Sequence, residues 1–88
     1  MRIEEVAVEK ETAEKIFKKH GVMLEEIKRC FLEQKTLYFK TRQNNYLALS
    51  HNGRSITIVF GYSNGTAEII TAYESSKWQK KLYKRKRK

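Results

Sequence analysis

The sequence contains no Asp, no Pro, one Cys and only two His among its 88 residues. A lone cysteine, Cys30, excludes an internal disulfide framework and fits a reducing compartment. These counts also supply too few ligands for a protein zinc site, so we expect neither a metal nor a cofactor. The glycine-rich phosphate loops of P-loop and dinucleotide-binding proteins are absent as well.

Long apolar runs are also missing from the sequence. No stretch approaches the roughly 20 residues of a membrane span, and the first residues lack the layout of a signal peptide. We therefore expect a cytoplasmic protein without membrane association. A hydrophobic content of 40% indicates a globular chain. Its length suits a single domain, residues 1–88, with one modest core.

Acidic residues are scarce in the second half of the chain. Residues 1–34 hold seven Lys or Arg and eight Glu, whereas residues 35–88 hold twelve Lys or Arg and two Glu. After Glu74 there is no acid, and eight cations follow. Such a gradient attracts polyanions and favours phosphate binding through the release of counterions. A disordered solubilising tail is the alternative for the last residues, and 84–88 are expected to fray.

Hydrophobic periodicity predicts a short strand and two helices in the first third of the chain. Residues 3–8 alternate weakly and predict the strand. A helix follows from about Glu11 to His20 with Ile16 and Phe17 on its apolar face, and Gly21 closes it. Five residues of the second helix are expected to point inward: Met23, Leu24, Ile27, Cys30 and Phe31. Cys30 is thus a packed core thiol, and His20 a packing or capping residue.

From residue 36 onward the pattern predicts strands. The expected strands cover residues 36–40, 46–50, 55–62 and 66–73, with turns at 43–45, at Asn52-Gly53 and at 63–65. Ser75 or Ser76 can cap a final helix that Trp78 and Leu82 anchor on the sheet. The sequence therefore predicts an α+β fold, a small antiparallel sheet with helices packed against it.

Cations alternate with aromatic side chains over the predicted sheet and last helix. The set comprises Lys40, Arg42, Tyr46, His51, Arg54, Tyr62, Tyr73, Lys77, Trp78 and Tyr83. Cations for phosphates and rings for stacking suit single-stranded RNA. The same residue types could support metal-independent RNA cleavage, in which a 2′-hydroxyl attacks the adjacent phosphate. Rings on strands are also ordinary core residues, so at least half of these are expected to be buried.

Four short motifs, in order along nearly the whole chain, resemble the BrnT-type toxins of the RelE superfamily. They are Lys19-His20-Gly21-Val22, Gly53-Arg54 before the strand 56–60, residues 69–72 (Ile-Ile-Thr-Ala), and Leu82-Tyr83. The resemblance implies a RelE-like fold with an N-terminal helical hairpin and a C-terminal helix. It implies a metal-independent ribonuclease that a cognate antitoxin neutralises, often a DNA-binding repressor encoded alongside.

The resemblance also suggests which residues would act on RNA. Arg54 and Arg42 would hold the scissile phosphate, while His51 or Tyr73 would move protons. Further phosphate contacts would come from Lys19, Lys40, Lys77, Lys80, Lys81, Lys84 and Arg85.

Three positions depart from the pattern of the BrnT-type toxins. Tyr73 stands where these toxins have Arg, Gln79 where they have an acid, and Ser50-His51 where Gly-Arg is frequent. Two functions therefore remain open: a ribonuclease toxin, or a non-catalytic nucleic-acid-binding module or degenerate toxin kept for its antitoxin complex.

Overall fold

A computed structural model describes residues 2–87 of the chain. Its elements are β1 (Glu5–Ala7), α1 (Lys10–His20), α2 (Leu24–Leu32), β2 (Leu37–Lys40), β3 (Tyr46–Asn52), β4 (Arg54–Ser63), β5 (Thr66–Glu74) and α3 (Lys77–Arg87). The α+β class predicted from the sequence is confirmed. Within the residues described, no helix is long and apolar enough to cross a membrane.

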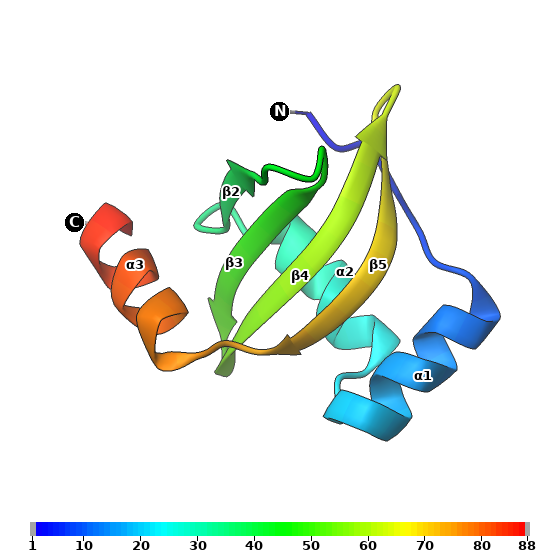
Figure 1. Cartoon of the computed structure of the whole chain (residues 1–88), viewed down its shortest axis with the longest axis horizontal. Helices are drawn as coiled ribbons and strands as arrows, with labels where there is room; N and C mark the ends of the chain where they lie inside the picture. Colours follow the sequence, from blue (N-terminus) through cyan, green and yellow to red (C-terminus); the bar gives the residue numbers. More distant parts are fainter. Residues whose placement is uncertain (1, 88) are drawn as a thin grey trace.

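The five strands form one mixed sheet in the order β1-β5-β4-β3-β2 (Figure 1). Strands β2 to β5 make the antiparallel meander that the turn residues predict. The prediction of a wholly antiparallel sheet is wrong at β1, which pairs with β5 in parallel. Two helices and three strands separate these partners along the chain, and such a long connection allows a parallel approach that a tight turn forbids.

Residues with positive φ make the tight turns. Gly53, at φ 84°, joins β3 to β4, and Asn64-Gly65, at 48° and 82°, join β4 to β5. Short hairpin turns need this conformation, which Gly and Asn tolerate best. Gly21, at φ 68°, closes α1 and donates its N–H to the Phe17 carbonyl. Both predicted hairpins and the predicted helix end are confirmed.

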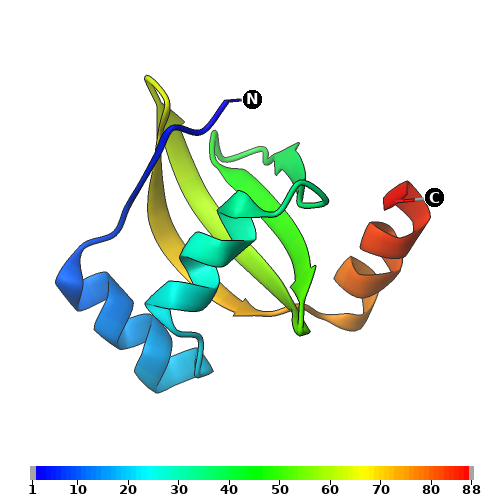
Figure 2. The same cartoon turned by 180° about the vertical axis from the view of Figure 1, so that it is seen from behind.

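The core lies between α1, α2 and one face of the sheet. Figure 2 shows both helices in front of that face. Ile56, Ile58 and Phe60 alternate along β4 and point into this core. Cys30 of α2 is buried among them, and burial raises the pKa of its thiol. The prediction of a packed core thiol is confirmed.

Two predicted core residues lie outside. Phe17 is 56% exposed and Met23 48% exposed. The reason is geometric: α1 buries a narrow stripe represented by Ile16, and the chain turns at Gly21 to bury Val22 instead of Met23. Phe17 and Met23 then line an open groove between the outer sides of α1 and α2.

Helix α3 docks on the opposite face of the sheet, through residues that the sequence did not indicate. Of the two predicted anchors, Trp78 is 60% exposed and Leu82 is half-buried, whereas Gln79 is only 4% exposed. Ser76 is confirmed as the cap: its Oγ accepts from the Gln79 N–H at 3.4 Å, and the Gln79 Oε1 accepts from the Ser76 N–H at 2.9 Å. This reciprocal pair is a capping box. The helix includes residues 84–87, and residue 88 lies outside the described residues, so the fraying of 84–88 stays a prediction.

Candidate functional site

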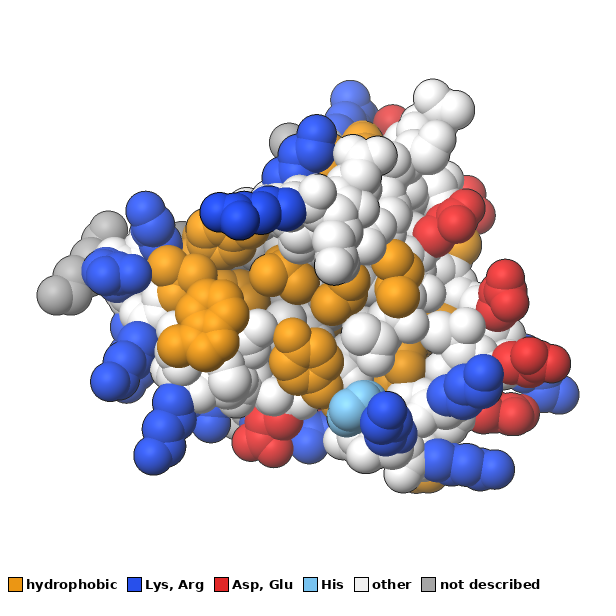
Figure 3. Space-filling model, in the orientation of Figure 1, with side chains coloured by type: hydrophobic (Ala, Val, Ile, Leu, Met, Phe, Trp, Pro, Cys, Tyr) orange, Lys and Arg blue, Asp and Glu red, His pale blue; other side chains and the backbone are white. Residues whose placement is uncertain are grey.

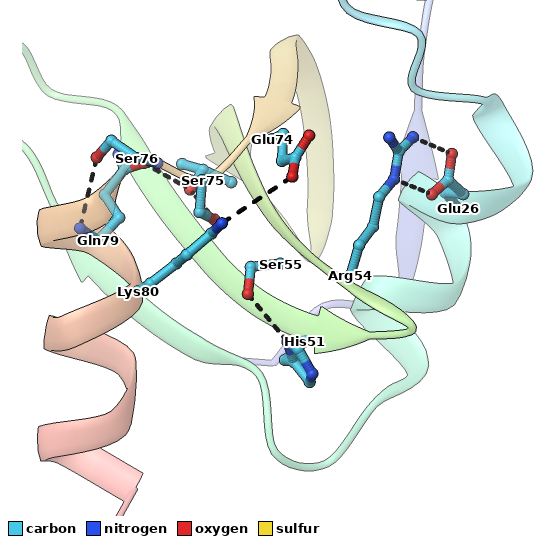
Figure 4. Close-up of polar contacts among 10 residues, drawn as sticks. Glu26, His51, Arg54, Ser55, Glu74, Ser75, Ser76, Gln79 and Lys80 are labelled. Carbon is cyan, nitrogen blue, oxygen red and sulfur yellow. Dashed lines mark hydrogen bonds and ion pairs between the residues drawn. The ribbon is translucent and has the colours of Figure 1, made fainter.

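A groove of about 380 Å³ lies between the β3–β4 hairpin and α3. Its lining residues are His51, Arg54, Ser55, Glu74, Lys80, Tyr83 and Lys84. Figure 4 shows His51, Arg54 and Ser55 at the end of the hairpin, Glu74 at the end of β5 and Lys80 in the first turns of α3. Tyr83 and Lys84 lie further along α3. The hairpin residue Gly53 sets the register that places His51 directly opposite Ser55. The groove is therefore built by elements that meet at one end of the sheet.

His51 supplies the imidazole of the groove, a group that can serve as a general base or acid. Its side chain is exposed, and its Nδ1 lies 2.9 Å from the Ser55 Oγ. This hydrogen bond orients the ring through Nδ1, so a ligand in the groove would meet Nε2. The arrangement resembles the general one in which a second group fixes the orientation of a catalytic base.

Lys80 and Lys84 supply positive charge to the groove from one face of α3. The Lys80 Nζ lies 4.0 Å from a carboxylate oxygen of Glu74, and both side chains are about half exposed. Exposed ion pairs of this kind contribute little to stability, so Lys80 can exchange Glu74 for a phosphate. Tyr83 forms part of the wall and donates its hydroxyl hydrogen to the Lys35 carbonyl at 3.1 Å. The groove thus places two exposed lysines beside a histidine that is oriented by a hydrogen bond.

Arg54 is held much more tightly than the lysines. Its Nη2 lies 2.7 Å from the Glu26 Oε1, its Nε 2.9 Å from the Glu26 Oε2, and Nη2 also donates to the Gly21 carbonyl at 2.9 Å. These bonds use three of the five guanidinium N–H donors. The hydrogen bond from Arg54 lowers the pKa of Glu26 below its ordinary value. Arg54 therefore clamps the junction between α1 and α2 to the start of β4, besides lining the groove.

Tyr73 lies at a second place, on the sheet face that α3 partly covers. It pairs with Thr57, two positions along β4 from Ser55. Its hydroxyl accepts from the Gln79 Nε2 at 3.1 Å, and its ring centroid lies 5.9 Å from that of His20. His20 and Lys19 border a separate pocket of about 300 Å³ beside α1. Tyr73 and Lys19 are thus not lining residues of the groove.

Arg42 and Lys40 lie at the far end of the molecule from the groove. Lys40 ends β2 and pairs with Tyr46, the first residue of β3, and Arg42 follows in the turn. His51 stands near the other end of the same strand. Lys77, Lys81 and Arg85 are exposed on α3 outside the groove lining. The structure therefore brings together His51, Arg54, Lys80 and Lys84, and leaves the other candidates apart.

Some contributing residues were missed, and the aromatic set behaves differently from expectation. Ser55 could not have been found from the predicted two-residue turn at Asn52-Gly53, because that turn would place His51 opposite Arg54. In the structure Asn52 pairs with Arg54, and this register places Ser55 opposite His51. Glu26 gave no local signal, since its partner Arg54 lies 28 residues away. Glu74 was noted only as the last acid of the sequence, whereas Tyr83 already belonged to the cation–aromatic set. None of the five rings in the set is fully buried, so the expectation that at least half would be buried is wrong: Trp78 is exposed, while Tyr46, Tyr62, Tyr73 and Tyr83 are half-buried.

Across residues 2–87, no group of three or more His, Cys or Glu side chains is arranged to hold a metal ion.

Comparisons with known proteins bear on the fold. No protein-family model matches the sequence, and no curated protein matches it. Among solved structures, the chain is similar to the crystal structure of the ribonuclease toxin BrnT of Brucella abortus, with a TM-score of 0.70 and 18% sequence identity. The match covers 83% of this chain and 97% of that one. The chain therefore has the BrnT-type toxin fold, as the motifs predicted.

Proposed function

We propose that this chain, with its BrnT-type fold, is a toxin that cuts RNA without a metal ion and is neutralised by an antitoxin. One observation carries the proposal: the fold brings His51, Lys80 and Lys84 into one groove of about 380 Å³. A histidine beside exposed cations provides what cleavage by an internal 2′-hydroxyl requires. We further propose that the protein acts in the cytoplasm and belongs, with the BrnT-type toxins, to the RelE superfamily.

Each of three groove residues has a separate role in the proposed reaction. The His51 Nε2 removes the proton from the 2′-hydroxyl, whose oxygen attacks the adjacent phosphorus. The bond from phosphorus to the 5′-oxygen breaks, and that oxygen takes a proton from the ammonium of Lys80. Lys84 neutralises the charge that grows on the phosphate. The products are a 2′,3′-cyclic phosphate and a free 5′-hydroxyl.

Purified protein incubated with mixed-sequence RNA in EDTA tests this proposal directly. We expect cleavage products that carry cyclic phosphate ends. The two histidines of the chain provide a matched pair of variants, since His51 lines the groove and His20 lies beside Tyr73. Cleavage should fall at least 100-fold in His51→Ala and persist in His20→Ala. The reverse result would move the site to Tyr73 and His20, and no cleavage by the folded wild-type protein would refute catalysis.

A non-catalytic function is the second candidate, and two observations favour it. Arg54 is engaged by Glu26 and the Gly21 carbonyl. Tyr73, where the BrnT-type toxins have Arg, is bonded to Gln79. A degenerate toxin or nucleic-acid-binding module would bind RNA and leave it uncut. Binding without product in EDTA or in Mg²⁺, together with unimpaired growth of cells that express the chain, would decide for this function.

The antitoxin is a proposed protein partner. We expect a neighbouring reading frame that encodes a small DNA-binding protein. Co-expression of that protein should yield a stable complex and should restore growth if the chain alone arrests it. A protein from the neighbouring frame that neither co-purifies nor restores growth would contradict the pairing.

A further inference from the structure

Trp78 is an exposed aromatic ring on the most basic element of the molecule. Its exposed fraction is 60%, although the adjacent Gln79 is buried. Leu82, one turn further along α3, is half-buried and lies on the same side of the helix. In Figure 3, hydrophobic side chains form a band from α3 across the open face of the sheet, with Lys and Arg around its α3 end and acidic side chains toward the opposite side. The ring therefore has a flat face available to a ligand.

The groove and Trp78 are connected by cations around the outside of α3. With about 3.6 residues per turn, successive positions can be placed around the helix axis. Lys80 and Lys84 face the groove. Lys77 and Lys81 come next around the outer surface, and Trp78 follows on the side away from the groove. One helix width of about 10 Å separates the two sites.

We propose that Trp78 is a stacking platform for an unpaired base of an RNA strand whose backbone follows the cations of α3 from the groove. The ligand class is single-stranded RNA, since the bases of a duplex are already stacked on each other and cannot cover the ring. The inference rests on the proposed function only in taking RNA as the ligand. It does not require that the RNA be cut.

The charge of α3 favours RNA over a protein as the occupant of this surface. Residues 77–87 contain seven Lys or Arg and no acid. Phosphates neutralise such a row of cations, and the aromatic ring then accepts a base regardless of its sequence. A protein partner would need a matching acidic segment beside an apolar one, and binding of such a partner is the competing outcome.

The fluorescence of Trp78 tests the proposal, because it is the only tryptophan in the chain. The probe is a short uridine oligonucleotide with 2′-O-methyl groups, which no 2′-hydroxyl reaction can cut. Titration of the full-length protein at low salt should quench the emission and saturate with the same affinity as the anisotropy of a labelled copy. A duplex of equal length should bind through its phosphates without comparable quenching.

Two variants separate stacking from general binding. Trp78→Ala should weaken binding of the single strand about 5- to 100-fold, whereas Trp78→Phe should retain most of the affinity. Phe17→Ala removes an equally exposed ring from α1 and should leave the affinity unchanged. Both α3 variants should melt within a few degrees of the wild type, since Trp78 is largely outside the core.

The outcomes distinguish this inference from the proposed function. Quenching by RNA without cleavage would support the stacking platform and count against catalysis. Normal RNA affinity in Trp78→Ala, or binding that leaves the emission unchanged, would overturn the platform and leave the ribonuclease proposal standing. Quenching by the antitoxin but not by RNA would also overturn it and assign the surface to the protein partner.

Discussion

At the scale of single residues, Gln79 shows how a polar side chain can hold an element in place. Its Oε1 accepts hydrogen bonds from the Thr57 hydroxyl at 3.0 Å and the Ser76 N–H at 2.9 Å. Its Nε2 donates to the Tyr73 hydroxyl at 3.1 Å. A buried amide satisfied at both ends adds specificity to the packing of α3, because any other docking would leave these groups without partners.

Gln79→Ala should therefore be costly. The change removes the acceptor of the Thr57 hydroxyl and the Ser76 N–H, and we expect a decrease of about 2–3 kcal/mol in the free energy of unfolding. The neighbouring Trp78→Ala is the control and should cost under about 1 kcal/mol. Urea unfolding of both variants measures the difference, and equal decreases would show that α3 docks through Trp78 instead.

The pair of Arg54 and Glu26 makes stability depend on pH. The two side chains are 37% and 30% exposed, so we expect Glu26→Gln to cost only about 1–2 kcal/mol at pH 7. Because Arg54 lowers the pKa of Glu26, this stabilisation is complete above the ordinary glutamate pKa of about 4.3 and is lost as the pH falls through the lowered value.

Unfolding curves of Glu26→Gln and wild type should thus converge at low pH and separate by pH 6. Glu25→Gln, on the exposed side of the same helix, should stay within about 0.5 kcal/mol of the wild type at every pH. A constant difference for Glu26→Gln from pH 2 to pH 7 would exclude the linkage. Because Arg54 also holds the junction of α1 and α2 to β4, a decrease of activity in Arg54→Ala would combine a loss of folded protein with the loss of any role of Arg54 in the reaction.

Cys30 provides a third prediction at this scale. Its thiol is 2% exposed, and desolvation raises its pKa, an effect that the nearby Ser50 hydroxyl partly offsets. The thiolate is the reactive form, so the native protein should resist a thiol reagent at pH 7.5 and react fully in denaturant. Rapid labelling of the native protein would show that α2 opens or that Cys30 is accessible.

At the scale of elements, local signals were sufficient where the structure is local. Gly53, Asn64-Gly65 and Gly21 mark turns because their conformation is a property of the residue itself, and all were predicted. The parallel pairing of β1 was not predicted, because nothing in residues 5–7 identifies β5 as a partner. Gln79 was overlooked as an anchor for the same reason, since its burial depends on Thr57, which lies 22 residues earlier.

The residues of the candidate site also fall into two groups: those that the local sequence indicates and those whose position depends on distant partners. His51, Lys80 and Lys84 could be selected from composition, and the structure brings them together. Arg42 could not be placed, because the length of β3 separates it from His51. The clamp on Arg54 could not be predicted either, since Glu26 lies 28 residues away on a helix whose packing the sequence left open.

At the scale of the whole molecule, the distribution of charge should decide how the proposed RNA binding responds to salt. Removal of one cation that neutralises a phosphate should reduce the log–log salt slope on single strands by about 0.7. Lys80→Gln with Lys84→Gln should therefore reduce the slope by about 1.4. Lys10→Gln with Lys28→Gln removes the same charge from the α1–α2 groove and should leave the slope unchanged. Equal reductions in both pairs would mean that RNA responds to net charge and not to α3.

The pairing of β1 with β5 has a consequence for the order of events during synthesis. Residues 5–7 must wait for residues 66–68 before they find their partner. Closing so long a loop is slower than forming the helices and the hairpins between them, so β1 should be the last strand to join. Helix α3 emerges later still, and it supplies one wall of the groove. A partly translated chain would therefore lack a complete groove, so under the proposed function it could not yet cut RNA.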